Sequence, residues 1–307
     1  MSLAVLYTRA SLGINAPRIT VETHLSNGLP KFSIVGLPAT VIKESKDRIR
    51  SAIINSQFKF PNRRITVNLA PADLPKAGSR FDLPIALGIL AASGQIPLTT
   101  LEQYEFIGEL ALSGSLRPVT SILPVVLAIR RDAKRFLKNN KNIGTPQLVL
   151  PESNAEEASL ADGVSLYPAT HLLAVCQHLC NNITLSNDTQ TIHPVNKSSA
   201  SKTKLDFSDV CGQLHAKRAL TIAAAGQHNI LLSGPPGSGK SMLAKRLNNI
   251  LPEMTEQEAL EVATIRSIAK LPIDPNHWKD RPYRAPHHTI SSVALVGGGN
   301  PPNPNIS

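Results

Sequence analysis

The sequence predicts an α/β protein built in two parts, and three observations support this prediction. Short β-like runs alternate with helical runs along residues 1–182. Residues 183–204 lose that periodicity and are rich in Asn, Ser, Thr and Lys, and a second α/β pattern follows in residues 205–307 around a glycine-rich loop. A chain of 307 residues is long enough for two domains that each bury a core. We therefore predict two domains joined by a polar linker.

In the first part, strands are predicted where alternating apolar residues are bounded by Gly, Asn or Pro, and helices where apolar residues recur at helical spacing. The predicted strands are 3–10, 18–25, 31–37, 64–71, 147–151 and 164–169, with a hairpin over 104–119 that turns at Ser113 and Gly114. The predicted helices are 38–57, 82–93, about 121–138, a short helix after 151, and about 170–181.

In the second part, the predicted elements are a helix over 215–226, a strand over 229–234 and a helix over 240–250. A further amphipathic helix begins at the capping box of Thr255 and Glu258. The second part therefore contains a strand, loop and helix in succession.

The loop between that strand and helix fits G-x-x-x-x-G-K-[ST] at every fixed position, and this pattern is typical of a phosphate-binding loop. Its glycines let main-chain N–H groups surround phosphate oxygens, its lysine places a charge on the β- and γ-phosphates, and its last hydroxyl ligates Mg²⁺. The predicted nucleotide contacts are Gly234, Pro235, Pro236, Gly237, Ser238, Gly239, Lys240, Ser241 and Met242, with Ser241 also on the Mg²⁺ of bound ATP.

Hydrolysis needs an acidic pair at the end of a second strand, to hold the metal and polarise the attacking water. No apolar run after Ser241 ends in Asp-Glu. The segment 271–274 contains Pro272 and makes a poor central strand. We therefore predict nucleotide binding without a complete catalytic site in this chain.

Several long motifs together resemble the ComM/YifB family of magnesium-chelatase-like AAA+ ATPases. They are "FSIVGLPATVIKESKDRIRSAIINS", "ITVNLAPADLPKAGSRFDLPIALGIL", "IGELALSGSLRPV", "AAAGQHNILLSGPPGSGKSMLAKRL" and "RPYRAPHHTISSVALVGGG". The resemblance covers most of 1–180 and about 205–307, and breaks only in the linker.

The resemblance implies a Lon-protease-like first domain and the opening portion of an AAA+ domain, in a hexameric motor that moves single-stranded or branched DNA during uptake of transforming DNA. It places Val210 and Gly212 near the adenine, with Cys211 as a small residue in that pocket, and DNA contact around 289–300. The family pattern continues into a Walker B strand, sensors and a lid. This chain therefore looks like a truncated member: a fragment, a frameshifted gene or a partial record.

A protease is a second interpretation, which the Lon-like resemblance raises. The alignment places Arg80 at the nucleophile position and Leu123 at the lysine position. A serine hydroxyl without a base is a poor nucleophile, so we expect a scaffold rather than a protease. Ser79, one residue away, keeps a shifted register open.

Other polar groups allow both a functional and a structural interpretation. Cys176 and Cys180 lie near His171 and His178, but the sequence shows no second pair of ligands for zinc. This favours a buried helix face over a zinc site. The adjacent His287 and His288 would point to opposite sides of an extended chain, so they do not predict a metal site.

The basic residues of two predicted helices could either contact phosphates or form a solvated helix face. They are Lys43, Lys46, Arg48 and Arg50 on 38–57, and Arg130, Arg131, Lys134, Arg135 and Lys138 on 121–138.

The composition and net charge of the sequence limit where the protein is located and what it binds. The net charge of +10 is compatible with a polyanionic partner. No apolar run approaches the roughly 18 residues that cross a bilayer, the first residues lack the pattern of a secretory signal, and three cysteines make no even disulfide framework. We therefore expect a cytoplasmic protein without membrane contact. The open alternatives to the DNA motor are a non-hydrolysing nucleotide-binding or assembly module and a metal-inserting chelatase subunit.

Overall fold

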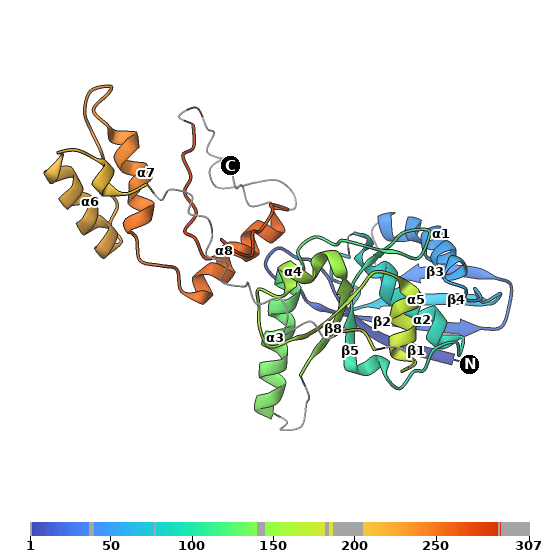
Figure 1. Cartoon of the computed structure of the whole chain (residues 1–307). Helices are drawn as coiled ribbons and strands as arrows, with labels where there is room; N and C mark the ends of the chain where they lie inside the picture. Colours follow the sequence, from blue (N-terminus) through green and yellow to red (C-terminus); the bar gives the residue numbers. More distant parts are fainter. Residues whose placement is uncertain are drawn as a thin grey trace. The chain divides into compact units, whose positions relative to one another are not determined.

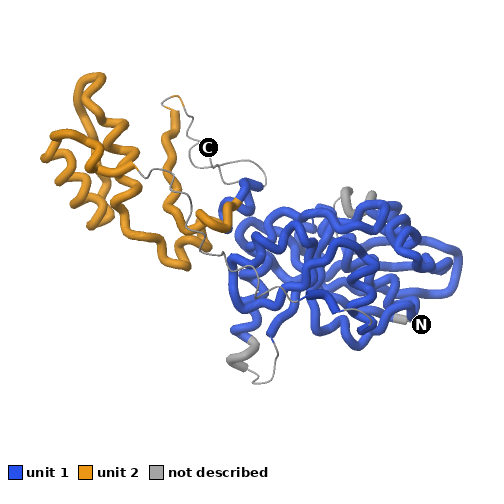
Figure 2. The backbone as a smooth tube through the Cα atoms, in the orientation of Figure 1, with its two compact units in different colours: residues 1–193, 264–272 blue, residues 194–263, 273–307 orange. Residues whose placement is uncertain are grey.

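The computed structural model describes residues 2–36, 40–76, 78–139, 145–181, 184–186, 205–287 and 289 (Figure 1). The chain forms two compact units (Figure 2). Unit 1 comprises residues 1–193 with 264–272, and unit 2 comprises residues 194–263 with 273–307. The α/β class predicted from the sequence is confirmed. The predicted linker, 183–204, lies outside the described residues except for 184–186.

A mixed sheet of seven strands forms the framework of unit 1, in the order β3-β4-β2-β1-β5-β8-β9. The pairs β2–β4 and β1–β2 are antiparallel, and the other four pairs are parallel. The strands are β1 (Ser2–Arg9), β2 (Arg18–Ser26), β3 (Lys31–Val35), β4 (Arg64–Ala70), β5 (Tyr104–Phe106), β8 (Gln147–Pro151) and β9 (Ser165–Ala169).

The predicted hairpin over 104–119 divides into separate strands. Its first residues form β5 in the main sheet, whereas β6 (Glu109–Leu110) and β7 (Leu116–Arg117) pair with each other in a sheet of two strands. The turn lies at the predicted place, since the Gly114 amide donates to the carbonyl of Ala111. The apolar run from 104 to 110 therefore belongs to two sheets.

The helices of unit 1 lie close to their predicted positions. They are α1 (Thr40–Asn55), α2 (Asp82–Ala92), α3 (Ile122–Asn139), α4 (Ala155–Ala158) and α5 (Leu172–Leu179), with short 3-10 turns at Ser79–Phe81, Leu101–Gln103 and Glu152–Asn154. Every residue of α2 is buried. This agrees with its sequence, which is apolar on all sides after Asp82.

Helices cover both faces of the sheet at β1. Side chains alternate between the faces of a strand, so Leu6 and Arg9 point in opposite directions. Leu6 lies beside Gly88 of α2, whereas Arg9 bonds Asp132 of α3. The sheet is therefore the middle layer between α2 and α3.

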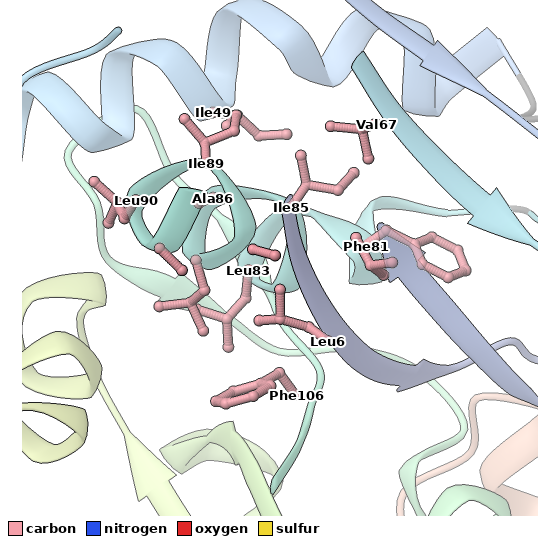
Figure 3. Close-up of a cluster of buried hydrophobic side chains, with 14 of the residues drawn as sticks. Leu6, Ile49, Val67, Phe81, Leu83, Ile85, Ala86, Ile89, Leu90 and Phe106 are labelled. Carbon is pink, nitrogen blue, oxygen red and sulfur yellow. The ribbon is translucent and has the colours of Figure 1, made fainter. Parts of the chain in front are cut away.

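The main core lies between α2, its neighbour α1 and the sheet (Figure 3). Burial of this apolar surface is the dominant stabilising contribution to such a layer. The labelled side chains in Figure 3 are Leu6, Ile49, Val67, Phe81, Leu83, Ile85, Ala86, Ile89, Leu90 and Phe106.

Residues 205–287 contain α6 (Leu214–Gly226), α7 (Lys240–Ile250) and α8 (Glu256–Ile268). The capping box that begins α8 is confirmed: the Thr255 amide donates to Glu258, and the Glu258 amide donates to the Thr255 hydroxyl. The predicted strand over 229–234 is wrong for the described structure, which has no strand there. A strand requires a hydrogen-bonded neighbour, and none of the described residues of unit 2 supplies one.

Within the described residues, no helix combines the length and apolar character that a bilayer crossing needs.

Candidate functional site

The glycine-rich loop of unit 2 turns sharply before α7. Gly237 and Gly239 have φ of 81° and 82°, in the left-handed region that favours glycine. Gly239 is also the residue that caps α7. An added Cβ at Gly239 would lie 3.2 Å from Nε2 of Gln213 and 3.3 Å from Cε of Met242. The left-handed main-chain conformation therefore explains glycine at this position, since the two neighbours are ends of flexible side chains.

Lys240 reaches back into the loop from the first turn of α7. Its Nζ donates to the carbonyl oxygens of Gly234 at 2.9 Å and Pro235 at 2.8 Å, and to the hydroxyl of Ser238 at 3.2 Å. These oxygens are neutral, and no ion pair within the described residues compensates the charge of Lys240. A phosphate oxygen, which carries negative charge, would bind the ammonium more strongly than they do.

The beginning of α7 is open to an anion. No side chain in the described part of the chain caps its free main-chain amides, and its first turn contains no acidic residue. The helix dipole adds a partial positive charge at this end. Ser241, in that turn, is exposed. Its hydroxyl is therefore accessible to a solvated cation.

The segment before α6 lies against the loop and α7. Val210 is buried together with Leu220 and Leu243. Lys217 donates to the carbonyl of Val210, and the side-chain amide of Gln213 donates to the carbonyl of Ser238 at 3.1 Å. The structure thus brings the predicted Val210 and Gly212 close to the loop, with Cys211 exposed between them.

Arg246 fixes this segment in place, which sequence reasoning missed. Its Nε donates to the carbonyl of Asp206 at 2.8 Å, and its Nη2 lies 3.2 Å from Oδ2 of Asp209. Asp206 and Asp209 themselves form a capping box around a short 3-10 turn. The Asp-x-x-Asp spacing before Val210 indicates the capping box in the sequence. No sequence pattern indicates the bond between Asp209 and Arg246, which lies 37 residues further along.

The residues at the Lon-like catalytic positions have structural roles in unit 1. Arg80 is buried, its Nη2 donates to the carbonyl of Thr120 at 2.7 Å, and burial lowers its pKa to about 10. Leu123 is fully buried. Ser79 donates to Glu109, which also lies near Arg117. Among the described residues, the contacts of Ser79 include Glu109 and no lysine, so the Ser-Lys pair that a Lon-type site needs does not form there.

The cysteine and histidine positions also have local partners. Cys176 is buried in the core, and burial raises its pKa to about 12. The His171 ring accepts from the amide of Leu173 at the start of α5, and His178 bonds the hydroxyl of Tyr104 at 3.0 Å. No group of three potential metal ligands occurs in the part of the chain that the structure describes. His288 lies outside it.

The basic residues of the two long helices differ in their surroundings. Arg48 is committed to Asp82, with 2.7 Å between Nε and Oδ2. Arg50 and Lys46 lie over the rings of Phe60 and Phe32. On α3, Arg131, Lys134 and Arg135 are exposed. The side chains of Lys43 and Lys138 lie outside the described residues, as does the predicted DNA segment, 289–300, except for Thr289.

The loop of residues 234–241, with Lys240 folded back onto it, has the pattern that is typical of proteins with a phosphate-binding loop. Comparison with known protein families identifies the family to which the chain belongs. The family model described as subunit ChlI of Mg-chelatase matches residues 21–142, and the model described as magnesium chelatase, subunit ChlI, matches residues 206–307. The chain belongs to the ComM/YifB family of magnesium-chelatase-like proteins.

Individual relatives agree over almost the whole chain. Competence protein ComM of Haemophilus influenzae is 51% identical over 304 residues, and the Escherichia coli protein YifB is 46% identical over 304 residues. Each alignment covers 99% of this chain and 57% of the relative, so the chain spans little more than half the length of these relatives. An archaeal Lon protease of Archaeoglobus fulgidus is 39% identical over 75 residues, which is 24% of this chain and 11% of that protein.

Proposed function

We propose that residues 205–287 bind ATP with Mg²⁺, as the opening part of an AAA+ domain in a hexameric DNA motor. In this proposal the intact protein hydrolyses ATP and moves single-stranded or branched DNA during DNA uptake. The relative named as a competence protein supports that setting. The match of residues 206–307 to the magnesium chelatase model supports the use of nucleotide.

The observation that carries the proposal is the geometry around Lys240. Among the described residues, neutral oxygens alone hold this ammonium group, and it lies beside the uncapped amides of α7, so two sources of positive potential meet in one loop. In the proposal, Lys240 binds the β- and γ-phosphates, Ser241 ligates Mg²⁺, and Gly234, Pro235, Pro236, Gly237, Ser238 and Gly239 surround the phosphates. Met242, Val210 and Gly212 complete the site near the base.

The Mg²⁺–ATP complex fits these donors because a hard cation prefers oxygen ligands and the exposed Ser241 supplies one. When bound, the metal would neutralise phosphate charge. The chain's own contribution is to hold the phosphates through Lys240 and the loop amides. Arg246 and Gln213 keep the neighbouring segment against the loop.

We further propose that this chain binds ATP without hydrolysing it. In residues 205–287 of the described structure, the hydrogen bonds and ion pairs place no carboxylate on Lys240 or Ser241. Hydrolysis requires such a carboxylate beside the metal. Residues 1–182 then act as a Lon-like scaffold for subunit contacts, residues 183–204 as a linker, and the protein is cytoplasmic, in agreement with three free cysteines.

Binding of a fluorescent ATP analogue to the 307-residue chain tests the site. We expect Mg²⁺-dependent binding that Lys240→Ala weakens about 10- to 100-fold, the loss typical of a hydrogen bond to a charged group. Lys245→Ala removes the same charge from an exposed position of α7 and is the matched control. Equal affinity of the wild-type chain and the Lys240→Ala variant would contradict the proposed site.

An assay of phosphate release distinguishes the proposed ATP-driven motor from the alternative functions. No turnover above the Lys240→Ala level is expected for this chain, whereas turnover above it would contradict the incomplete catalytic site. If the full-length protein also binds ATP without turnover, the function becomes that of a non-hydrolysing nucleotide-binding or assembly module. A metal-inserting chelatase subunit, suggested by the name of the family model, predicts ATP-dependent metal insertion and no dependence on DNA.

A further inference from the structure

A basic pocket lies in unit 1, at the open edge of the sheet, far in sequence from the glycine-rich loop. Strand β3 is the outermost strand on that side. The pocket has a volume of about 250 Å³ and is formed by β3, α1 and the segment that leads into β4. The side chains that matter are Lys31, Phe32, Arg50, Phe60 and Arg63.

The charge of the pocket has one sign. Lys31, Arg50 and Arg63 line it, and none of the described residues that line it is acidic. Within the described residues, the ion pairs do not include these three cations. Three cations around a small concavity raise the local concentration of anions.

Two aromatic rings form the apolar part of the same pocket. The ring centroids of Phe32 and Phe60 are 6.2 Å apart, and both rings are only partly buried. Arg50 lies 5.3 Å from the ring centroid of Phe60, and Lys46 lies 5.9 Å from that of Phe32. A guanidinium stacked on a ring is held in position while its N–H groups remain available to a phosphate.

The fold explains why these residues meet. Phe32 pairs with Ile65 in the parallel register of β3 and β4, so its ring faces the core side, next to the core residue Ile65. Residues 60–63 precede β4 and bring Phe60 and Arg63 to the same edge, and Arg50 projects there from α1. Charge from three separate elements converges here, which a merely solvated helix face would not produce.

We propose that this pocket binds single-stranded nucleic acid, with the cations on phosphates and a base against the phenylalanine rings. An unpaired base exposes a π-face that stacks on an aromatic side chain, whereas the bases of a duplex are already stacked on each other. Cations beside aromatic rings therefore select a single strand over a duplex. The pocket lies in unit 1, so this binding requires neither Lys240 nor ATP.

The experiment measures the anisotropy of a fluorescent 20-nucleotide deoxythymidine strand titrated with the 307-residue chain at several salt concentrations. Arg50→Gln combined with Arg63→Gln should weaken binding about 10- to 100-fold at low salt. The dependence of log affinity on log salt should fall by about 1.4, because each phosphate contact on a single strand contributes about 0.7. Phe60→Leu, which keeps the site apolar, should weaken binding at least about fivefold.

Controls separate the pocket from general charge and from the ATP site. Arg131→Gln with Lys134→Gln removes two exposed charges from α3 and should change affinity less than twofold. Lys240→Ala should leave strand binding intact even where it abolishes ATP binding. Inorganic phosphate and thymidine monophosphate at equal ionic strength should compete only weakly, since each fills one part of the site.

Four results would overturn the proposal. They are no strand binding by the wild-type chain at low salt, equal losses in the pocket and α3 variants, equal affinity for a duplex, and full displacement by inorganic phosphate alone. Thermal unfolding of each variant guards against misfolding. The two arginines are exposed, so their substitution should leave the unfolding midpoint unchanged even if Phe60→Leu lowers it.

Discussion

Arg48 of α1 pairs with Asp82 at the start of α2, with 2.7 Å between Nε and Oδ2, although only 1% of the Asp82 side chain is exposed. The amide of Leu110 donates to the same oxygen at 3.2 Å. Burial nevertheless raises the pKa of Asp82 to about 6, because desolvation outweighs both of these stabilising contacts. This pair joins α1, α2 and β6 at one point.

The raised pKa of Asp82 predicts a pH-dependent stability. Between about pH 4 and pH 6 the folded chain keeps a proton that the unfolded chain has released, so the contribution of this group falls as pH rises through that window. Asp82→Asn removes the titration. As pH rises from 4 to 7, the free energy of unfolding of the variant should increase by about 2 to 3 kcal/mol relative to that of wild type.

Urea unfolding followed by circular dichroism at pH 4, 5.5 and 7 measures this difference, and other carboxylates cancel in the comparison. A constant offset between the two proteins at all three pH values would mean that Asp82 does not titrate in that range.

The elements of unit 1 could be predicted from the sequence because their signals are local. Strands β2 and β4 alternate apolar and polar residues, and α2 is apolar on all sides. The pairing of Arg48 with Asp82 could not be predicted, since it joins residues 34 apart whose contact depends on the packing of two helices. The sequence therefore left Arg48 among the candidate phosphate ligands.

A buried cluster around Arg9 gives a second prediction. Arg9 donates two hydrogen bonds to Glu105, at 2.6 and 2.7 Å, and a third to Asp132 at 2.5 Å. Arg9→Met leaves both carboxylates without this partner, and the free energy of unfolding should fall by about 3 to 5 kcal/mol.

Arg131 is the matched control, because it lies 3.9 Å from the same Asp132 but is half exposed. Arg131→Met should cost less than about 1 kcal/mol. Similar urea midpoints for the two variants would show that the buried cluster adds nothing beyond a surface ion pair.

Arg246 gives a prediction about the candidate nucleotide site. Arg246→Ala removes the bonds to Asp206 and Asp209, so the segment that carries Val210 and Gly212 loses its attachment to α7. Affinity for the ATP analogue should fall about three- to tenfold, although Lys240 is intact. Arg218→Ala, at an exposed position of α6, should have no effect. Unchanged affinity in Arg246→Ala would remove the segment from the proposed site.

The loop itself could be predicted from the sequence, whereas its supports could not. The spacing of Gly234, Gly239 and Lys240 is a local pattern with a known mechanism. Gln213 contributes through a left-handed conformation, φ 53°, and a side chain that reaches Ser238. Neither feature has a signal in sequence. The strand before the loop was predicted wrongly because its apolar pattern is present but no described strand pairs with it.

The exposure of apolar residues predicts that residues 205–250 are less protected from proteolysis than the main sheet of unit 1. Leu231 is 90% exposed and Leu214 is 75% exposed, although Val210, Leu220 and Leu243 form a buried cluster nearby. A segment whose large apolar side chains are exposed gains little free energy from burial, so it opens locally more often, and a protease cleaves it in proportion to that opening. Limited thermolysin digestion followed by mass spectrometry should therefore cut near Leu214 and Leu231 at least about tenfold faster than within the seven strands of the main sheet. Mg²⁺–ATP should slow these cuts, since a ligand bound only to the folded loop stabilises it. Lys240→Ala should abolish that protection but not the cleavage itself. Survival of residues 205–250 for as long as the main sheet of unit 1, in the absence of nucleotide, would contradict this prediction.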